Sequence, residues 1–148
     1  MVILTFVRLY FLSPRPESLP LHDKSERYHQ QATQAYQQTL AQSGQIYTTD
    51  YVLDETFTFF FRRLTAYRAE QSMKGLLAAF STSNFHLIRI NEERFSKTVE
   101  LRSKFLDKPL ISFTDLTSMV AMRELDITTI LTEDAHFTHV VMGFQLLS

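Results

Sequence analysis

From residue 45 onward, short apolar runs alternate with longer stretches whose apolar residues recur at helical spacing. This alternation constrains the fold more than any other feature of the chain. It predicts short strands at residues 45–49, 86–90, 110–112, 127–132 and 140–147. Helices are expected at residues 50–69, 70–82, 91–107 and 115–125, and a further helix is expected to end near residue 43. Helices that alternate with short buried strands indicate an α/β fold with a mostly parallel sheet and helices on both faces.

Two of the expected helices carry many large apolar residues. The helix over residues 50–69, which Asp50 is expected to cap, begins with YVLDETFTFFF, and this run is apolar nearly all round. Such a helix is largely buried, and its phenylalanines are expected in the core or at a partner interface. The helix over residues 91–107 places its apolar residues near one face, namely Phe95, Val99, Phe105 and Leu106.

The first twenty residues differ from the rest of the chain. Residues 1–12 are apolar apart from one arginine and are expected to form a buried strand rather than a signal peptide, because no small-residue cleavage site follows. Residues 13–20, SPRPESLP, contain three of the four prolines of the chain and are expected to be irregular. We therefore divide the chain into an atypical segment, 1–20, and a domain, 21–148.

Composition excludes several classes of protein. The chain has no cysteine, so disulfide scaffolds, thiolate zinc sites and cysteine nucleophiles are ruled out, and a reducing, cytoplasmic location is expected. Fifteen Lys and Arg against 16 Asp and Glu give a net charge of −1, so nucleic-acid contacts would come from a local basic patch. No apolar run is long enough to span a membrane. Three scattered glycines exclude a Rossmann-type dinucleotide loop.

Acidic residues stand where a parallel sheet forms its sites. Asp115 and Asp134 each follow a predicted strand, and Glu55 lies one turn into the second helix, where periodicity alone leaves open whether Asp54 or Glu55 faces inward. Converging carboxylates repel one another unless a cation balances them, and all-oxygen ligands select Mg²⁺ or Mn²⁺. The alternative is that Asp115 only begins a helix and Asp134 only occupies a turn.

Three segments in this order and spacing resemble the PIN-domain ribonucleases, and within them the VapC-type toxins: TTDYVLDET (48–56), LISFTDLTSMVAMREL (110–125) and ILTEDAHF…GFQLL (130–147). The resemblance spans about residues 21–148. It implies a three-layer sandwich with a central, mostly parallel sheet, and a metal-dependent endoribonuclease that uses Mg²⁺ or Mn²⁺. The matched residues are Glu55, Asp115 and Asp134 as catalytic metal ligands, supported by Thr114 and Ser112.

One position departs from the family pattern. The family opens with a strand that ends in a ligand Asp, and alignment places that Asp near Ser13, whereas residues 1–22 contain no Asp and Glu17 is the only acid there. We interpret the N-terminus as altered, for example by a frameshift or a misplaced start. This leaves two functions open: a toxin ribonuclease, or a catalytically impaired relative that binds RNA or an antitoxin.

Basic residues follow Glu55 along the chain, and the resemblance also implies partners. Arg62, Arg63, Arg68 and Lys74 are expected either to grip RNA phosphates or to form a solvated helix face. PIN toxins usually dimerise and bind a cognate antitoxin, so we expect a homodimer, an antitoxin partner and an RNA substrate. A receiver-like domain, the competing α/β reading, lacks its late lysine here, because Lys108 is the last lysine and precedes Asp115.

Overall fold

The computed structural model describes residues 44–130, together with residues 34, 37, 38, 41, 42, 143, 145 and 146. The predicted first strand, the proline-rich segment and the division of the chain at residue 20 lie outside the described residues, as do Ser13, Glu17 and Asp134. Of the expected first helix, residues 34, 37, 38 and 41 are described and are helical.

The described strands form two parallel pairs, as predicted for an α/β fold. β1 (Ile46–Thr49) pairs with β2 (Phe85–Ile88), and β3 (Thr129–Ile130) pairs with β4 (Gln145–Leu146). The helices are α2 (Asp50–Arg63), α3 (Ala66–Ala79), α4 (Glu92–Lys104) and α5 (Phe113–Glu124). None of these described helices is long and apolar enough to cross a membrane.

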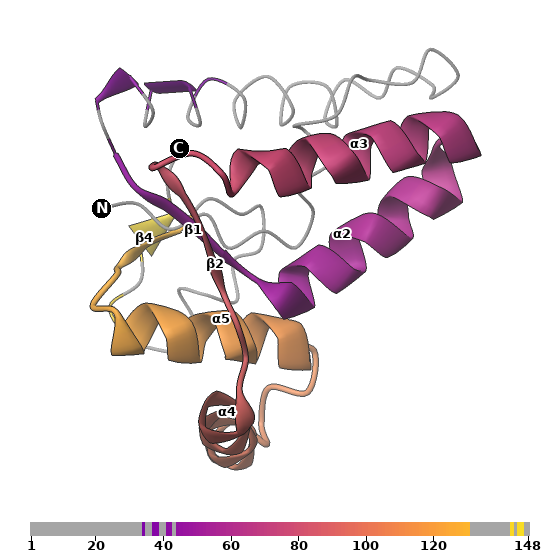
Figure 1. The fold of residues 1–148 in the computed structure, drawn as a ribbon. Helices are drawn as coiled ribbons and strands as arrows, with labels where there is room; N and C mark the ends of the chain where they lie inside the picture. The colour runs from indigo at the N-terminus through magenta and orange to yellow at the C-terminus, as the bar shows by residue number, and fades with distance from the viewer. Residues whose placement is uncertain are drawn as a thin grey trace.

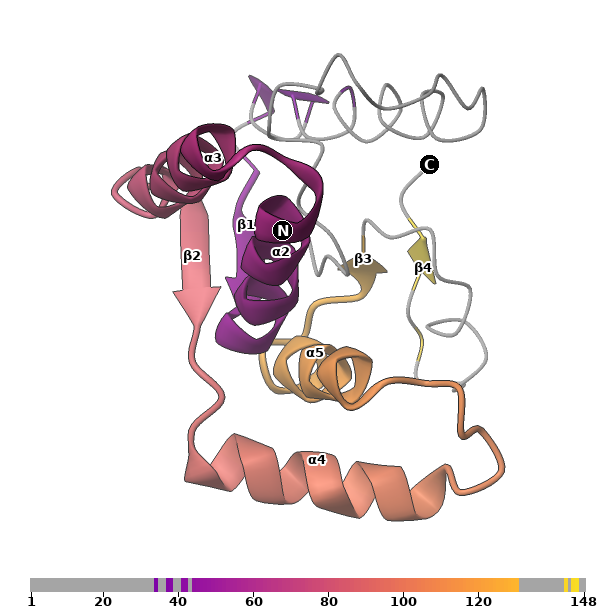
Figure 2. The same ribbon diagram turned by 90° about the vertical axis from the view of Figure 1, so that its right-hand side faces the viewer.

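β1 lies between two hydrophobic cores, because neighbouring residues of a strand point to opposite faces. Ile46 is fully buried in a core shared with α2 and α3, whereas Tyr47 packs against a second core that is built around α5. Helices α2 and α5 both contact β1, α3 packs on α2, and α4 packs on α5 on the side away from β1 (Figures 1 and 2). The sheet formed by β1 and β2 therefore has helices on both faces.

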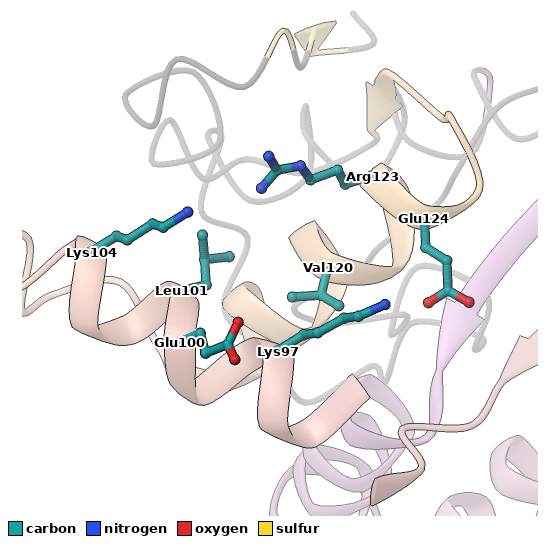
Figure 3. A pocket seen from close by; sticks show the side chains of 7 residues that line it. All are labelled: Lys97, Glu100, Leu101, Lys104, Val120, Arg123 and Glu124. Atoms are coloured by element: carbon teal, nitrogen blue, oxygen red, sulfur yellow. The ribbon is translucent and has the colours of Figure 1, made fainter. Parts of the chain in front are cut away.

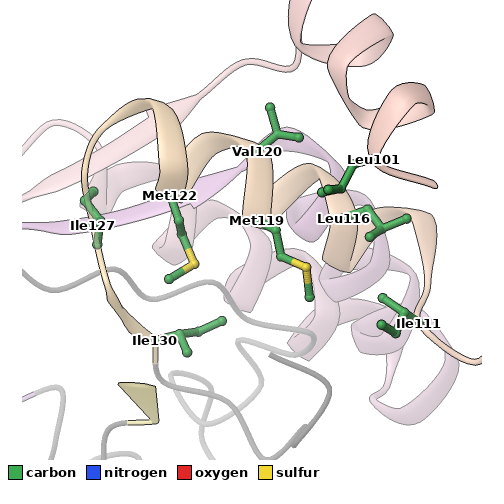
Figure 4. Packing of buried hydrophobic residues seen from close by; sticks show 8 residues of the cluster. All are labelled: Leu101, Ile111, Leu116, Met119, Val120, Met122, Ile127 and Ile130. Carbon is green, nitrogen blue, oxygen red and sulfur yellow. The ribbon is translucent and has the colours of Figure 1, made fainter. Parts of the chain in front are cut away.

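The second core follows from the composition of α5. Eight consecutive residues of this helix, from Asp115 to Met122, are buried, so α5 is enclosed on nearly all sides. Its side chains pack with residues from α4, β3 and the connecting loops, and the cluster consists of Leu101, Ile111, Leu116, Met119, Val120, Met122, Ile127 and Ile130 (Figure 4).

The predicted helix over residues 50–69 is wrong in its length. α2 ends at Arg63, Leu64 has an extended backbone, and Thr65 caps a new helix by accepting a hydrogen bond from the Arg68 N–H at 3.3 Å. The two helices can then fold back on each other and bury Phe60, Ala69 and Leu76 in one core. Threonine is a favourable N-cap residue, so a new helix can begin at Thr65. The spacing of apolar residues does not reveal such a cap.

The predicted strand at residues 110–112 is also wrong. Leu110 is 83% exposed, Ile111 is buried, and Ser112 is the N-cap of α5. This segment is a turn at the start of a helix, because the Ser112 hydroxyl satisfies an N–H of the first turn. Only Ile111 contributes to the core.

Most of the apolar stripe of the fourth predicted helix is not buried, and only Phe105, just beyond the end of α4, packs against the second core. Phe95 and Val99 are 44% and 46% exposed, and Leu106, beyond the end of α4, is 76% exposed. The helix instead packs on α5 through Thr98 and Leu101. Thr98 tolerates burial because its hydroxyl donates to the carbonyl of Arg94 at 2.7 Å.

Candidate functional site at the starts of three helices

Asp115 occupies the first turn of α5 and is 4% exposed. The Ser112 hydroxyl accepts a hydrogen bond from the Asp115 backbone N–H at 3.0 Å, which holds this turn in helical geometry. The predicted helix start at Asp115 is confirmed, but a helix cap and not a strand precedes it, and its role as a metal ligand stays a prediction.

Glu55 lies in the second turn of α2 and is half-buried, whereas its neighbour Asp54 is exposed. The structure thus decides which of the two acids faces the protein. The buried residues Val52 and Thr56 lie on either side of Glu55 in the sequence and set the orientation of the helix.

The first turns of α2, α4 and α5 meet around one aromatic residue. The ring of Phe113, the first residue of α5, lies 6.3 Å from the ring of Tyr51 on α2 and 5.3 Å from that of Phe95 on α4, centroid to centroid. Glu55 is one turn beyond Tyr51, and Asp115 is two residues beyond Phe113. The two acids therefore stand on adjoining helix starts, beyond the carboxyl ends of β1 and β2. The contact between Tyr51 and Phe113 was not predicted from the sequence, although each residue lies within two positions of a helix cap.

Asp50 lies beside these residues, at the start of α2, but has a structural role. Its Oδ1 atom accepts hydrogen bonds from the backbone N–H groups of Tyr51 at 3.1 Å and Ile90 at 3.0 Å, which ties the start of α2 to the chain after β2. The expected cap at Asp50 is corrected to Thr49, whose hydroxyl accepts from the Val52 N–H at 3.2 Å. Asp50 is the first residue of α2 itself.

The donor atoms at this edge suit a hard cation. Glu55 and Asp115 offer carboxylate oxygens, the ligands that Mg²⁺ and Mn²⁺ prefer. No group of three acids or histidines gathers among the residues that the structure describes. The third predicted ligand, Asp134, lies outside them, so the complete ligand set stays a prediction.

The hydroxyl and basic residues predicted beside the acids take different roles. Ser112 caps α5, and Thr114 is half-buried, with its carbonyl accepting from the Thr117 hydroxyl at 2.5 Å. Arg62, Arg63 and Arg68 are all exposed near the junction of α2 and α3. The Arg63 guanidinium lies 5.8 Å from the centre of the Phe59 ring. Lys74 forms an ion pair with Glu70 one turn away on α3, which balances its charge.

No family model and no curated protein sequence matches this chain. Its fold is similar to the crystal structure of Mycobacterium tuberculosis VapC20, described there as a sarcin–ricin loop cleaving toxin, with a TM-score of 0.66. The two sequences are 19% identical, and the match covers 97% of this chain and 96% of VapC20. The likeness confirms the predicted α/β fold, that of the VapC-type PIN proteins.

Proposed function

We propose that this chain is a metal-dependent endoribonuclease of the VapC toxin type. The observation that carries the proposal is the contact between the first turns of α2 and α5, the helices that carry Glu55 and Asp115, within a fold similar to that of an RNA-cleaving toxin. In this proposal Asp134 completes the carboxylate set, and Ser112 and Thr114 support Asp115. The substrate is RNA, and the natural first substrate to test is a sarcin–ricin loop, because VapC20 cleaves one.

The residues of this chain have distinct tasks in the proposed reaction. Glu55 and Asp115 hold Mg²⁺ or Mn²⁺, which when bound supplies a water of lowered pKa and balances charge on the phosphoryl group. The starts of α2 and α5, the helices that carry Glu55 and Asp115, offer the positive ends of their helix dipoles to an anionic phosphodiester. Arg62, Arg63 and Arg68 offer exposed guanidinium groups to phosphates farther along the strand. No nucleophilic side chain is needed.

The sequence also supports a second candidate function, a PIN-like protein with impaired catalysis that binds RNA or an antitoxin. It is favoured by the absence of Asp from residues 1–22, where the family places its first ligand. Both candidates include an antitoxin partner, a homodimer and a cytoplasmic location, which all stay predictions.

The deciding experiment is cleavage of a sarcin–ricin loop RNA by the purified chain with Mg²⁺ or Mn²⁺. Glu55→Gln and Asp115→Asn are each expected to reduce the rate by at least about 100-fold, since even residues that only support metal ligands are worth roughly 10–100-fold. Asp54→Asn is the matched control, because it makes the same charge change one position away on the exposed side of α2.

Binding of the metal is measured separately through thermal stability. Mn²⁺ at millimolar concentration is expected to raise the melting temperature of the native chain and of Asp54→Asn, and to raise that of Asp115→Asn less. Cleavage that survives in both Glu55→Gln and Asp115→Asn would refute the proposal. An inactive native chain that gains activity with Ser13→Asp would favour the impaired protein.

A further inference from the structure

A pocket of about 340 Å³ opens between α4 and α5 and has no role in the proposed cleavage. Its floor is apolar, formed by Leu101 from α4 and Val120 from α5. Its rim carries charged side chains from both helices, namely Lys97, Glu100, Lys104, Arg123 and Glu124 (Figure 3). The volume lies at the lower end of the range that holds small organic ligands, roughly 300–1,000 Å³.

Two of the rim charges are already balanced by residues outside the pocket. The Glu124 carboxylate forms a two-point ion pair with Arg94, with both N–O distances 2.9 Å. Lys97 Nζ lies 3.2 Å from a carboxylate oxygen of Glu93. Within the described part of the chain, Lys104, Arg123 and Glu100 form no ion pair. The free charges of the rim are therefore two cations and one anion, and the pocket favours an anionic ligand.

The arrangement of the cations suggests the shape of that ligand. Lys104 and Arg123 extend from different helices toward the space above Leu101 and Val120 (Figure 3). Cationic groups above an apolar floor fit a molecule with an anionic end and a flat, weakly polar body. A nucleotide has both parts, since its phosphate accepts from Lys and Arg and its base rests on apolar surface or stacks on a guanidinium plane.

The pocket is distinct from the carboxylate site. Asp115 is in the first turn of α5 and Arg123 is in the last, about 12 Å away along the helix axis. Val120 is five residues after Asp115, so it projects about 140° around the helix from that acid. A ligand in this pocket therefore does not occupy the space between Glu55 and Asp115.

We propose that the pocket between α4 and α5 binds a nucleotide, with Lys104 and Arg123 holding its phosphate and Leu101 and Val120 supporting its base. The nucleotide is either free or one unit of an RNA strand. The inference does not depend on the proposed nuclease, because binding is measured without cleavage.

The first test is titration of the full chain with 5′-AMP in EDTA at low salt, by calorimetry or by chemical shifts of the Leu101 and Val120 methyl groups. Lys104→Gln and Arg123→Gln are each expected to weaken binding about 3- to 10-fold, and the double variant is expected to abolish it. Glu100→Gln is expected to tighten binding about threefold, because it removes the opposing charge. Lys74→Gln, the same charge change on α3, is the control and is expected to bind like the native chain.

The ligand class and its source are tested by three further probes. Adenosine without phosphate is expected to bind at least tenfold more weakly than AMP. A 2′-O-methyl oligoribonucleotide that binds more tightly than AMP, and loses that gain in the double variant, identifies an RNA strand as the source; AMP binding without such a gain identifies a free nucleotide. The proposal is overturned if AMP binds the double variant as well as the native chain, if AMP does not bind the native chain at millimolar concentration, or if an acidic peptide alone binds through Lys104 and Arg123.

Discussion

Arg94, near the start of α4, grips Glu124, the last residue of α5, through two parallel hydrogen bonds: Nε to Oε2 and Nη2 to Oε1, both 2.9 Å. The third guanidinium nitrogen, Nη1, donates to the carbonyl of Arg89 at 2.7 Å. One side chain thus joins α4, α5 and the segment that follows β2. The pair fastens the start of α4 to the end of α5, beside the pocket between these two helices, whose axes cross steeply (Figures 1 and 2).

The pair predicts a specific dependence of stability on pH. Hydrogen bonding to Arg94 holds the pKa of Glu124 below its ordinary value of 4.5, so the native state favours the ionised carboxylate. The contribution is therefore present above about pH 4.5 and is lost as the pH falls through the lower, folded-state pKa. Because Glu124 is partly exposed, Glu124→Gln is expected to cost at most about 1 kcal/mol at pH 7.

The measurement is the free energy of unfolding in urea, for the native chain and for Glu124→Gln, from pH 7 to pH 3. The difference between the two proteins is expected to shrink below pH 4.5. A difference that stays constant down to pH 3 would show that the carboxylate charge does not contribute.

Two neighbouring threonines of β1 predict opposite effects from one substitution. Thr48 Oγ1 is buried and has no hydrogen-bond partner in the described part of the structure, so Thr48→Val is expected to stabilise the fold by about 1 kcal/mol. Thr49 caps α2, so Thr49→Val is expected to destabilise it by about 1 kcal/mol. Urea denaturation of both variants measures whether each substitution raises or lowers the free energy of unfolding. A loss of stability in Thr48→Val would indicate that its hydroxyl is satisfied.

The cap of α5 links stability to the proposed cleavage. The Ser112 hydroxyl accepts from the Asp115 N–H, so Ser112→Ala is expected to destabilise the chain by about 1 kcal/mol and to loosen the turn that carries Asp115. Ser112→Asn is the matched variant, because asparagine caps a helix equally well. Thermal denaturation and RNA cleavage are measured together. Equal behaviour of the Ala and Asn variants would contradict a capping role.

Arg102 holds the loop that leads to this cap. Its Nη1 donates to the carbonyl of Ile111 at 2.6 Å, and its Nη2 donates to the carbonyls of Phe105 and Lys108. Lysine cannot span three carbonyls with the same geometry, so Arg102→Lys is expected to cost about 1–3 kcal/mol. Arg68→Lys, on an exposed turn of α3, is the control and is expected to change the free energy of unfolding by less than about 0.5 kcal/mol. An Arg102→Lys variant whose free energy of unfolding equals that of the native chain would contradict this role of Arg102.

The sequence by itself determined the α/β class, the order of most elements and the place of Asp115 at the start of a helix. These features are local: helical spacing, β-branched runs and capping residues act within a few residues of one another. The resemblance to PIN domains likewise rested on local motifs, and the fold of the described residues agrees with it.

Only the tertiary structure decided the features that depend on contacts between distant residues. Among them are the choice of Glu55 over Asp54 as the inward acid and the exposure of the apolar stripe on α4. The break between α2 and α3 and the turn at residues 110–112 have a local cause instead, because Thr65 and Ser112 cap new helices at points that the apolar pattern runs across. The inward acid and the exposed stripe are set by which neighbouring element covers a surface, and a one-dimensional pattern does not contain that neighbour.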